Sequence, residues 1–425
     1  MDGAARTALT RVSADPARPT FGQVFADTEF RALWLAQLFS VAGDQLARVA
    51  MTILVYDRTH SVLWTALTYA VTFLPWVVGG LALSGIADRF PRRQVMVTCD
   101  VARMILVLLM AVVSVLVAAG TGLWIMVALL FVVTLLDSPF KSARSAMMPE
   151  ILTADRYVLG LAVTQTTIQT GTAAGFALGG VVVALTGVNT ALVLDAATFG
   201  FSAFLAWYWV RQRPAAAPAG ASRSQLAEIA AGVRLVFGNR ALRTLMLLGW
   251  LVAFYVVPMG LAAPYAADLH ASLAIPIATG LVFAAGPFGT AVGSMVFGRL
   301  VPSAARQRWM GPLAVTACGV LLLCALRTSL IAALVIIAVS GACASYQMAA
   351  NAAFVAAVPS QRRGQAFGLA NGGMQVLQGL WIVLAGAVAS ANAVTPAAAI
   401  AISGGLGAVL AAALAISRTR EPTKT

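Results

Sequence analysis

The sequence contains twelve apolar runs of about 20 residues or more, separated by short polar segments. A helix of this length crosses the roughly 30 Å hydrocarbon core of a bilayer, and lipid excludes open sheets and irregular backbone. The sequence therefore predicts an all-α integral membrane protein with twelve transmembrane helices in two six-helix halves. The expected spans are 31–56, 62–86, 94–119, 122–146, 157–184, 188–210, 243–267, 274–299, 307–327, 329–355, 364–390 and 394–417.

The composition excludes an ordinary soluble domain. Apolar residues make up 60% of the chain and charged residues 10%, against about 45–50% and 25% in soluble proteins. The net charge of +13 is spread through the gaps between apolar runs, so no nucleic-acid partner is expected. Residues 1–30 are polar and lack the apolar core of a cleavable signal.

The charges between the spans predict the orientation of the chain. With both termini in the cytoplasm, the cytoplasmic segments hold almost all the basic residues, whereas the outer loops hold only Arg58 and Arg327. Positive loops remain in the cytoplasm. The chain is rich in Ala, and Lys141 and Lys424 are its only lysines. This bias is typical of a GC-rich bacterial genome, and we expect a multi-pass protein of the bacterial cytoplasmic membrane.

A polar linker at 211–224 divides the chain, and the amphipathic segment Gln225–Phe237 follows it. Two landmarks, Arg89/Arg299 and Pro149/Pro359, recur at the same offset of 210, which indicates duplicated halves. The expected parts are a cytoplasmic N-terminal segment (1–30), a six-helix bundle (31–210), a cytoplasmic linker with an amphipathic helix (211–242), a second six-helix bundle (243–417) and a cytoplasmic tail (418–425).

Few charged residues lie inside the spans, and such residues usually have a function or a partner. Asp44 and Arg48 lie four residues apart on one helix face and can pair. We predict proton coupling at Asp44 with Arg48, because burial favours the protonated acid and a neighbouring guanidinium opposes it. Asp137 is the alternative site. Asp100 and Arg103 are expected to form a fixed pair near the inner surface, and Asp195 is expected to orient its helix.

Other polar and aromatic side chains are candidates for a substrate cavity between the halves. The predicted cavity residues are Gln45, Phe131, Tyr255, Met259, Tyr346, Gln347 and Asn351. Such walls suit varied apolar ligands, although each residue could equally pack between helices. No cysteine or histidine spacing indicates a metal site, no nucleophile–base set indicates an enzyme, and no cofactor is expected.

Ser84–Arg93, S-G-I-A-D-R-F-P-R-R, resembles the signature between helices 2 and 3 of the major facilitator superfamily, with Ser84 and Pro91 replacing its two glycines. From this stretch we expect a conformational latch in which Asp88 accepts from Arg144 or from the start of helix 11. The latch would comprise Gly85, Asp88, Arg89, Arg92, Arg93 and Arg144.

The run G-T-A-A-G-F-A-L-G-G in helix 5 resembles the signature of drug–proton antiporters, with Phe176 replacing its proline. Its glycines, Gly171, Gly175, Gly179 and Gly180, are expected to pack against a neighbouring helix. The segments 30–46, 137–150, 195–199 and 362–369 are similar to those of the superfamily's bacterial exporters of siderophores and macrolides.

The resemblance implies alternating access and export of amphipathic compounds. We therefore expect a proton-coupled exporter that uses the proton gradient as its energy source. Its partners would be a small-molecule substrate and the lipid bilayer, and a monomer is expected. A lipid or lysolipid flippase, or an uptake carrier of the same fold, remains the alternative, and a requirement for a pH gradient would distinguish them.

Overall fold

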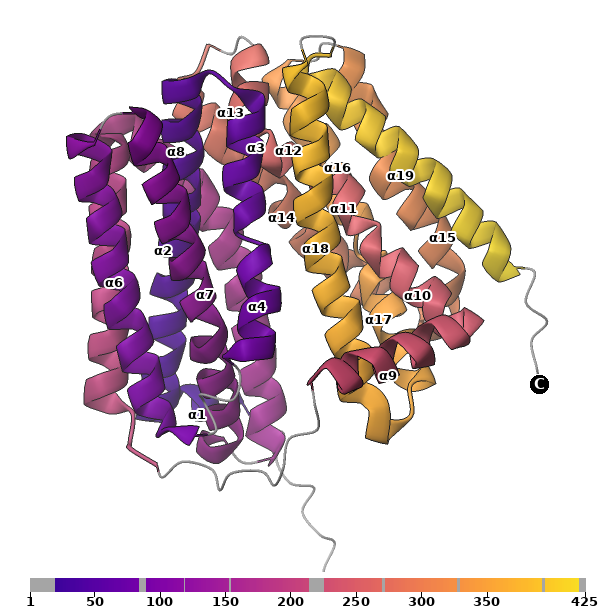
Figure 1. Ribbon diagram of the computed structural model, residues 1–425. Helices are drawn as coiled ribbons and strands as arrows, with labels where there is room; N and C mark the ends of the chain where they lie inside the picture. The colour runs from indigo at the N-terminus through magenta and orange to yellow at the C-terminus, as the bar shows by residue number, and fades with distance from the viewer. Residues whose placement is uncertain are drawn as a thin grey trace, which may run out of the picture.

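Two helical bundles stand side by side in the computed structural model (Figure 1), which describes residues 20–83, 89–117, 119–152, 154–213, 225–269, 272–326, 329–391 and 394–419. The first bundle, indigo to magenta, comprises residues 20–213, and the second, rose to yellow, comprises residues 225–419. No strand occurs among the described residues.

The first bundle begins with a short helix along one end of the molecule. Asp27 caps the long helix that follows, accepting from the backbone N–H of Glu29 at 2.9 Å. Gly187, with φ 83°, divides α8 into two antiparallel arms, 154–186 and 188–209. The elements are α1 (Phe21–Phe25), α2 (Thr28–Thr59), α3 (Val62–Val71), α4 (Leu74–Ala82), α6 (Arg92–Leu116), α7 (Ala119–Ile151) and α8 (Ala154–Trp209).

The second bundle begins with α9, which lies across its lower end in Figure 1 and packs on α10 and α18. Its seventh span is divided into four short helices, in a segment that includes Pro258 and Pro264. The elements are α9 (Gln225–Gly238), α10 (Arg240–Trp250), α11 (Val252–Tyr255), α12 (Val257–Gly260), α13 (Ala262–Asp268), α14 (Ile275–Leu300), α15 (Ser303–Gly319), η1 (Val320–Leu326), α16 (Leu330–Cys343), α17 (Tyr346–Ala357), η2 (Ser360–Arg362), α18 (Arg363–Ser390) and α19 (Pro396–Thr419).

The predicted fold class is confirmed. Among the described residues, ten helices are long and apolar enough to cross a membrane, and a shorter apolar helix spans Val62–Trp76. One of the ten, Arg156–Trp209, contains the two arms of α8. The total of twelve spans agrees with the sequence prediction. The division of helix 2 at Phe73, just before Pro75, was not predicted.

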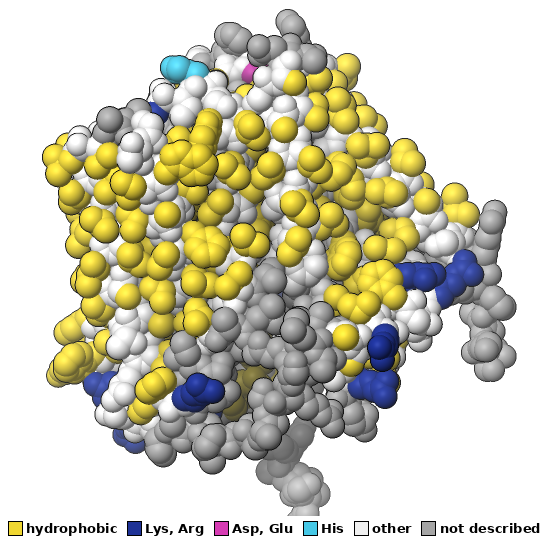
Figure 2. All heavy atoms as spheres, in the orientation of Figure 1, with side chains coloured by type: hydrophobic (Ala, Val, Ile, Leu, Met, Phe, Trp, Pro, Cys, Tyr) yellow, Lys and Arg dark blue, Asp and Glu magenta, His cyan; other side chains and the backbone are white. Residues whose placement is uncertain are grey.

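The two ends of the molecule differ in charge. We call the lower end in Figure 1, with α1 and α9, the α9 end, and the opposite end, with the turn between α2 and α3, the Ser61 end. Figure 2 shows hydrophobic side chains over the flanks of both bundles and Lys and Arg side chains mostly toward the α9 end. The hydrophobic flanks match what a bilayer would contact.

The bundles contact each other closely at the Ser61 end. Between α8 and α14, a Cβ on Gly180 would lie 2.9 Å from the Cα of Gly280. One turn away, the rings of Phe176 and Phe283 stack with centroids 4.8 Å apart. Between α3 and α18, the N–H of Leu63 donates to the hydroxyl of Ser390 at 2.8 Å. We call these contacts the Ser61-end seal.

Toward the α9 end, the two sets of helices diverge in Figure 1, although α4 still contacts α18.

Candidate functional site

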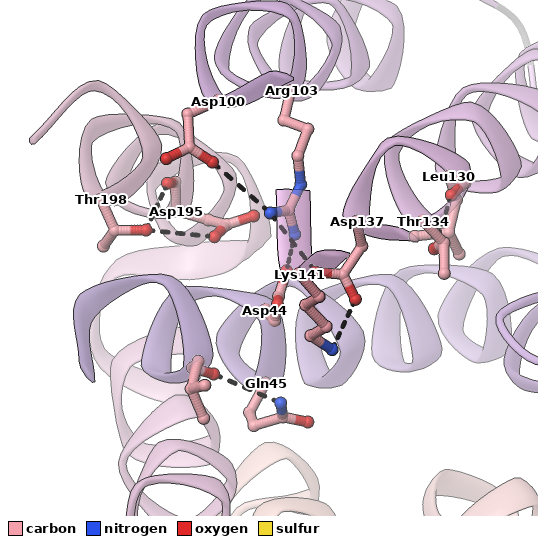
Figure 3. A network of polar contacts seen from close by, with 11 residues as sticks. Asp44, Gln45, Asp100, Arg103, Leu130, Thr134, Asp137, Lys141, Asp195 and Thr198 are labelled. Atoms are coloured by element: carbon pink, nitrogen blue, oxygen red, sulfur yellow. Dashed lines mark hydrogen bonds and ion pairs between the residues drawn. The ribbon is translucent and has the colours of Figure 1, made fainter. Parts of the chain in front are cut away.

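A buried arginine lies at the centre of the first bundle. Arg103, on α6, is 1% exposed and donates from Nη2 to Oδ1 of Asp44 at 2.7 Å. Its Nη1 lies 3.6 Å from Oδ1 of Asp100 and 3.7 Å from Oδ1 of Asp137. Figure 3 shows these carboxylates converging on the guanidinium from three helices. One cation is thus shared by three acids.

The position of Arg103 follows from helix geometry. It lies eleven residues after Arg92, where α6 begins, which places it about 16 Å along a helix of 25 residues. Phe199 on the second arm of α8 supports the guanidinium, whose carbon lies 4.0 Å from the ring centroid. Charge and ring together hold Arg103 between α2, α7 and α8.

The network reaches solvent through Lys141. The ammonium group of Lys141 lies 2.6 Å from Oδ2 of Asp137, one turn earlier on α7, and 4.1 Å from the ring centroid of Trp76 on α4. The side chain of Lys141 is 37% exposed, whereas that of Asp137 is 6% exposed. Asp137 therefore links the buried arginine to an accessible cation.

Asp195 lies on the second arm of α8, against the turn of α2 that carries Gly43 and Asp44, and is 1% exposed. The hydroxyl of Thr198 lies 3.4 Å from its Oδ1 (Figure 3). The backbone of Gly43 fits against both side chains, and a Cβ there would overlap them. Gly43 therefore allows α2 to approach α8 at the level of Asp44.

A small cavity connects these groups. It is lined by Asp44, Arg48, Arg103, Asp137 and Asp195, with walls from apolar residues such as Val107 and Met110. Its volume of about 20 Å³ is enough for one water molecule.

The partner of Asp44 differs from the sequence prediction. Among the described residues, Arg48 lies within ion-pair distance of no acid, and it contacts the hydroxyl of Tyr69 instead. Arg48 still lines the cavity with Asp44. Local spacing indicated Arg48, but the packing of α6 on the rest of the bundle brings Arg103 to the carboxylate.

The expected pair of Asp100 and Arg103 is present, with Nη1 3.6 Å from Oδ1 of Asp100, but Arg103 also binds Asp44 and lies near Asp137. Arg103 lies near the middle of its helix, and Asp100 is fully buried beside it. Neither oxygen of Asp100 accepts a hydrogen bond from a described residue. Counting residues from the start of the span would have located Arg103 near the middle of its helix.

The predicted cavity residues of the second bundle partly converge. Gln347 on α17 donates to the hydroxyl of Tyr255 at 2.5 Å, and the hydroxyl of the buried Tyr346 donates to the carbonyl of Leu248 at 2.8 Å. Gln347 and Asn351 line a pocket between α10, α17 and α18.

Three other predicted cavity residues lie elsewhere. Met259 contacts the hydroxyl of Tyr69 across the two bundles, with its sulfur 3.7 Å away. Phe131, on α7, is partly buried. Gln45 packs against Gly175 on the first arm of α8.

The helix 5 glycines lie in contact with two helices. Gly171, Gly175 and Gly179 face α2, and Gly180 faces α14 across the bundle boundary. Phe176 replaces the proline of the antiporter signature, and α8 stays helical there. Its ring joins the Ser61-end seal instead.

The expected latch lies partly outside the described residues, which exclude Gly85 and Asp88. Arg89 is exposed and precedes α6, Arg93 is partly buried in the first turn of α6, and Arg144 is nine-tenths buried on α7. Arg92 pairs with Glu150 and donates to the carbonyl of Ala146 at 3.0 Å. No His, Cys, Asp and Glu grouping suited to a metal ion occurs in the described ranges.

Comparison with known proteins identifies a family and relatives that are named as exporters. The model of the Major Facilitator Superfamily matches residues 33–310. Enterobactin exporter EntS of Citrobacter koseri is 28% identical over 285 residues, and the alignment covers 64% of each chain. EntS of Shigella dysenteriae serotype 1 is 28% identical over 290 residues, covering 65% of this chain and 64% of its own. The matched region thus spans less than two thirds of these relatives.

Solved structures share the fold over nearly the whole chain. A bacterial homologue of the human lysosomal transporter Spinster, inward-facing and occupied, has a TM-score of 0.72 at 15% identity and covers 93% of this chain and 97% of its own. The nucleoside transporter NupG has a TM-score of 0.64 at 16% identity, with coverage of 92% and 98%. At these identities, the likeness concerns the fold alone.

Proposed function

Because the chain belongs to the Major Facilitator Superfamily, we propose that this multi-pass membrane transporter is a secondary active exporter of amphipathic small molecules, driven by proton antiport. The curated relatives named as enterobactin exporters support the export direction. No catalytic role is proposed, because the ionisable groups that cluster at mid-membrane suit proton binding.

The charge network around Arg103 is the observation that best supports proton antiport. Ionisable groups at mid-membrane are costly and usually mark an ion or proton path. Here the carboxylates of Asp44, Asp100 and Asp137 surround one guanidinium in a single bundle. Burial on this scale supports a proton-coupling role better than a purely structural one.

Protonation of Asp44 would redistribute the hydrogen bonds of Arg103. With Asp44 ionised, Nη2 of Arg103 is held at 2.7 Å. With Asp44 neutral, that charge-assisted bond weakens, and Nη1 remains 3.6–3.7 Å from Asp100 and Asp137. Arg103 can then move toward these acids, and Asp137 can in turn release Lys141, which reaches solvent. A proton would thus alter the charge presented at the accessible edge of the bundle.

The closed Ser61 end supports alternating access. The basic α9 end fits the cytoplasmic side, since positive loops remain inside, so the arrangement is closed to the outside. Opening the seal while the α9 end closes would expose the network to the other side. A proton can drive this change only if the two arrangements bind it unequally.

The pocket in the second bundle has a volume of about 70 Å³, too small for a whole substrate, but the side chains around it suit contact with part of an amphipathic and uncharged molecule. No charged side chain lines this pocket among the described residues. The indole N–H of Trp250 donates to the carbonyl of Ala370 at 2.8 Å, which fixes a ring at the wall. Aromatic, thioether and amide groups together suit a ligand with rings and hydrogen-bonding atoms. They come from Trp250, Phe354, Phe367, Met246, Met374, Gln347, Asn351 and Asn371.

The test is transport into inside-out vesicles that contain the purified protein, with an imposed pH gradient and a panel of fluorescent amphipathic compounds. We expect accumulation that a protonophore abolishes. Accumulation that is unaffected by the protonophore would contradict proton antiport, and movement of labelled phospholipid alone would favour a flippase.

A further inference from the structure

A basic pocket lies at the α9 end, where α9 meets η2 and the first turns of α18. Its volume is about 670 Å³, and its lining includes Arg234, Leu235, Asn239, Arg362 and Gln365. No acidic residue lines it among the described residues. Among the residues whose side chains are described, neither arginine forms an ion pair with an acid, and both are exposed. The pocket thus presents two exposed cations.

Close backbone packing fixes the two arginines relative to each other. A Cβ on Gly232 would lie 2.7 Å from the carbonyl oxygen of Gln365, so α9 lies directly on the start of α18. Val236, fully buried one turn later, anchors α9 in the second bundle. Arg234 on α9 and Arg362 on η2 therefore border a formed pocket.

Neutral donors complete the lining. The Oδ1 of Asn239 caps α10, accepting from the N–H groups of Ala241 and Leu242 at 3.0 and 3.2 Å. Its NH₂ group remains as a donor at the pocket. Arg362 is the N-cap of α18 and provides no side-chain cap to that helix. Guanidinium and N–H groups around one space are the chemistry that binds phosphate.

We propose that this pocket binds the phosphate group of an anionic phospholipid. The amphipathic character of α9 favours a lipid over a soluble phosphate. Val233 and Phe237 are 38% and 42% exposed and lie one turn apart beside Arg234. An apolar edge next to a cation is typical of a helix at the membrane interface, where acyl chains meet headgroups. Basic pockets between membrane helices bind anionic headgroups in this way.

The test measures the thermal unfolding midpoint of the full-length protein in detergent during titration with short-chain phosphatidylglycerol or phosphatidylcholine. We expect phosphatidylglycerol alone to raise the midpoint of the wild type. In the double variant Arg234→Ala/Arg362→Ala, the phosphatidylglycerol concentration that gives half of the rise in the midpoint should increase about thirtyfold. This is the change expected when two cations near an anionic headgroup are removed. The midpoint without added lipid reports whether this variant folds, and the single variants Arg234→Gln and Arg362→Gln provide a milder change.

The matched control is Arg299→Ala/Arg308→Ala, which removes two exposed cations from the same end of the same bundle but outside the pocket. It should respond to phosphatidylglycerol as the wild type does. Equal responses from both double variants would overturn the site. A separate titration with inorganic phosphate distinguishes the sources: if phosphate alone reproduces the shift and phosphatidylglycerol has no advantage over phosphatidylcholine, the lipid assignment is wrong. The unfolding midpoint does not depend on transport, so this measurement tests the lipid site independently of the proposed export.

Discussion

The guanidinium of Arg103 lies 2.7 Å from the carboxylate of Asp44, although 59 positions separate the two residues. This contact joins the middle of α6 to the middle of α2, whereas Asp44 and Arg48 lie four residues apart on one helix.

Replacing Asp44 by Asn should abolish transport driven by a pH gradient, with a loss of tenfold or more, because the site can no longer exchange a proton. The measurement is gradient-driven export in vesicles that contain the variant protein. Asp57→Asn, at an exposed position on the same helix, should retain transport. Full export by Asp44→Asn, with loss in Asp137→Asn alone, would move the proton site to α7.

Replacing Arg103 by Met should destabilise the protein by about 3–5 kcal/mol, because the buried carboxylates lose their shared cation. Adding Asp44→Asn should recover part of the loss, since one uncompensated charge is removed. Denaturant unfolding in detergent gives both values. Arg48→Met is the comparison and should reduce the stability less. An equal loss would indicate that Arg48 stabilises the buried carboxylates as strongly as Arg103 does.

Replacing Gly180 by Ala should weaken the Ser61-end seal. The new Cβ would lie 2.5 Å from the carbonyl oxygen of Pro276, and such overpacking costs about 1–3 kcal/mol. The ratio of closed to open molecules should therefore fall roughly fivefold or more. Spin labels at Ser61 and Ala391 would show a longer distance. Gly298→Ala, on α14 with open space around it, should leave the distances unchanged.

The orientation of the chain can be tested by cysteine labelling in intact cells, after replacement of the four native cysteines. A cysteine at position 220 should be protected from an impermeant reagent, because the linker is expected in the cytoplasm. A cysteine at Ser61 should react. Labelling at 220 without labelling at Ser61 would reverse the assignment of the α9 end.

The sequence predicted the helices better than their contacts. Apolar runs and their charged ends determine where a helix crosses a membrane, so the spans could be predicted, and Asp44 lies near the middle of α2 as its place in the predicted span indicates. The pairing of Asp44 with Arg103 depends on how α2 and α6 are rotated about their axes, and that information lies in the packing of both helices on α8. The local rule for residues four apart favoured Arg48 because it considers a single helix.

The same limit explains the candidate cavity. Tyr255 and Gln347 were predicted as separate lining residues, and their hydrogen bond requires α11 and α17 to meet. Gln45 lies one residue after Asp44, but consecutive helix positions point in different directions. Its side chain therefore meets Gly175.

The distribution of charge between the bundles has an electrical consequence. The described charges of the second bundle lie near helix ends, whereas Asp44, Arg103 and Asp137 lie mid-helix in the first. Moving one elementary charge across the membrane changes its free energy by about 2.3 kcal/mol per 100 mV. If transport proceeds by alternating access, as proposed, movement of the second bundle would carry no such mid-helix charge across the field. The membrane voltage should therefore act on transport only through the first bundle, its proton and any charge on the substrate.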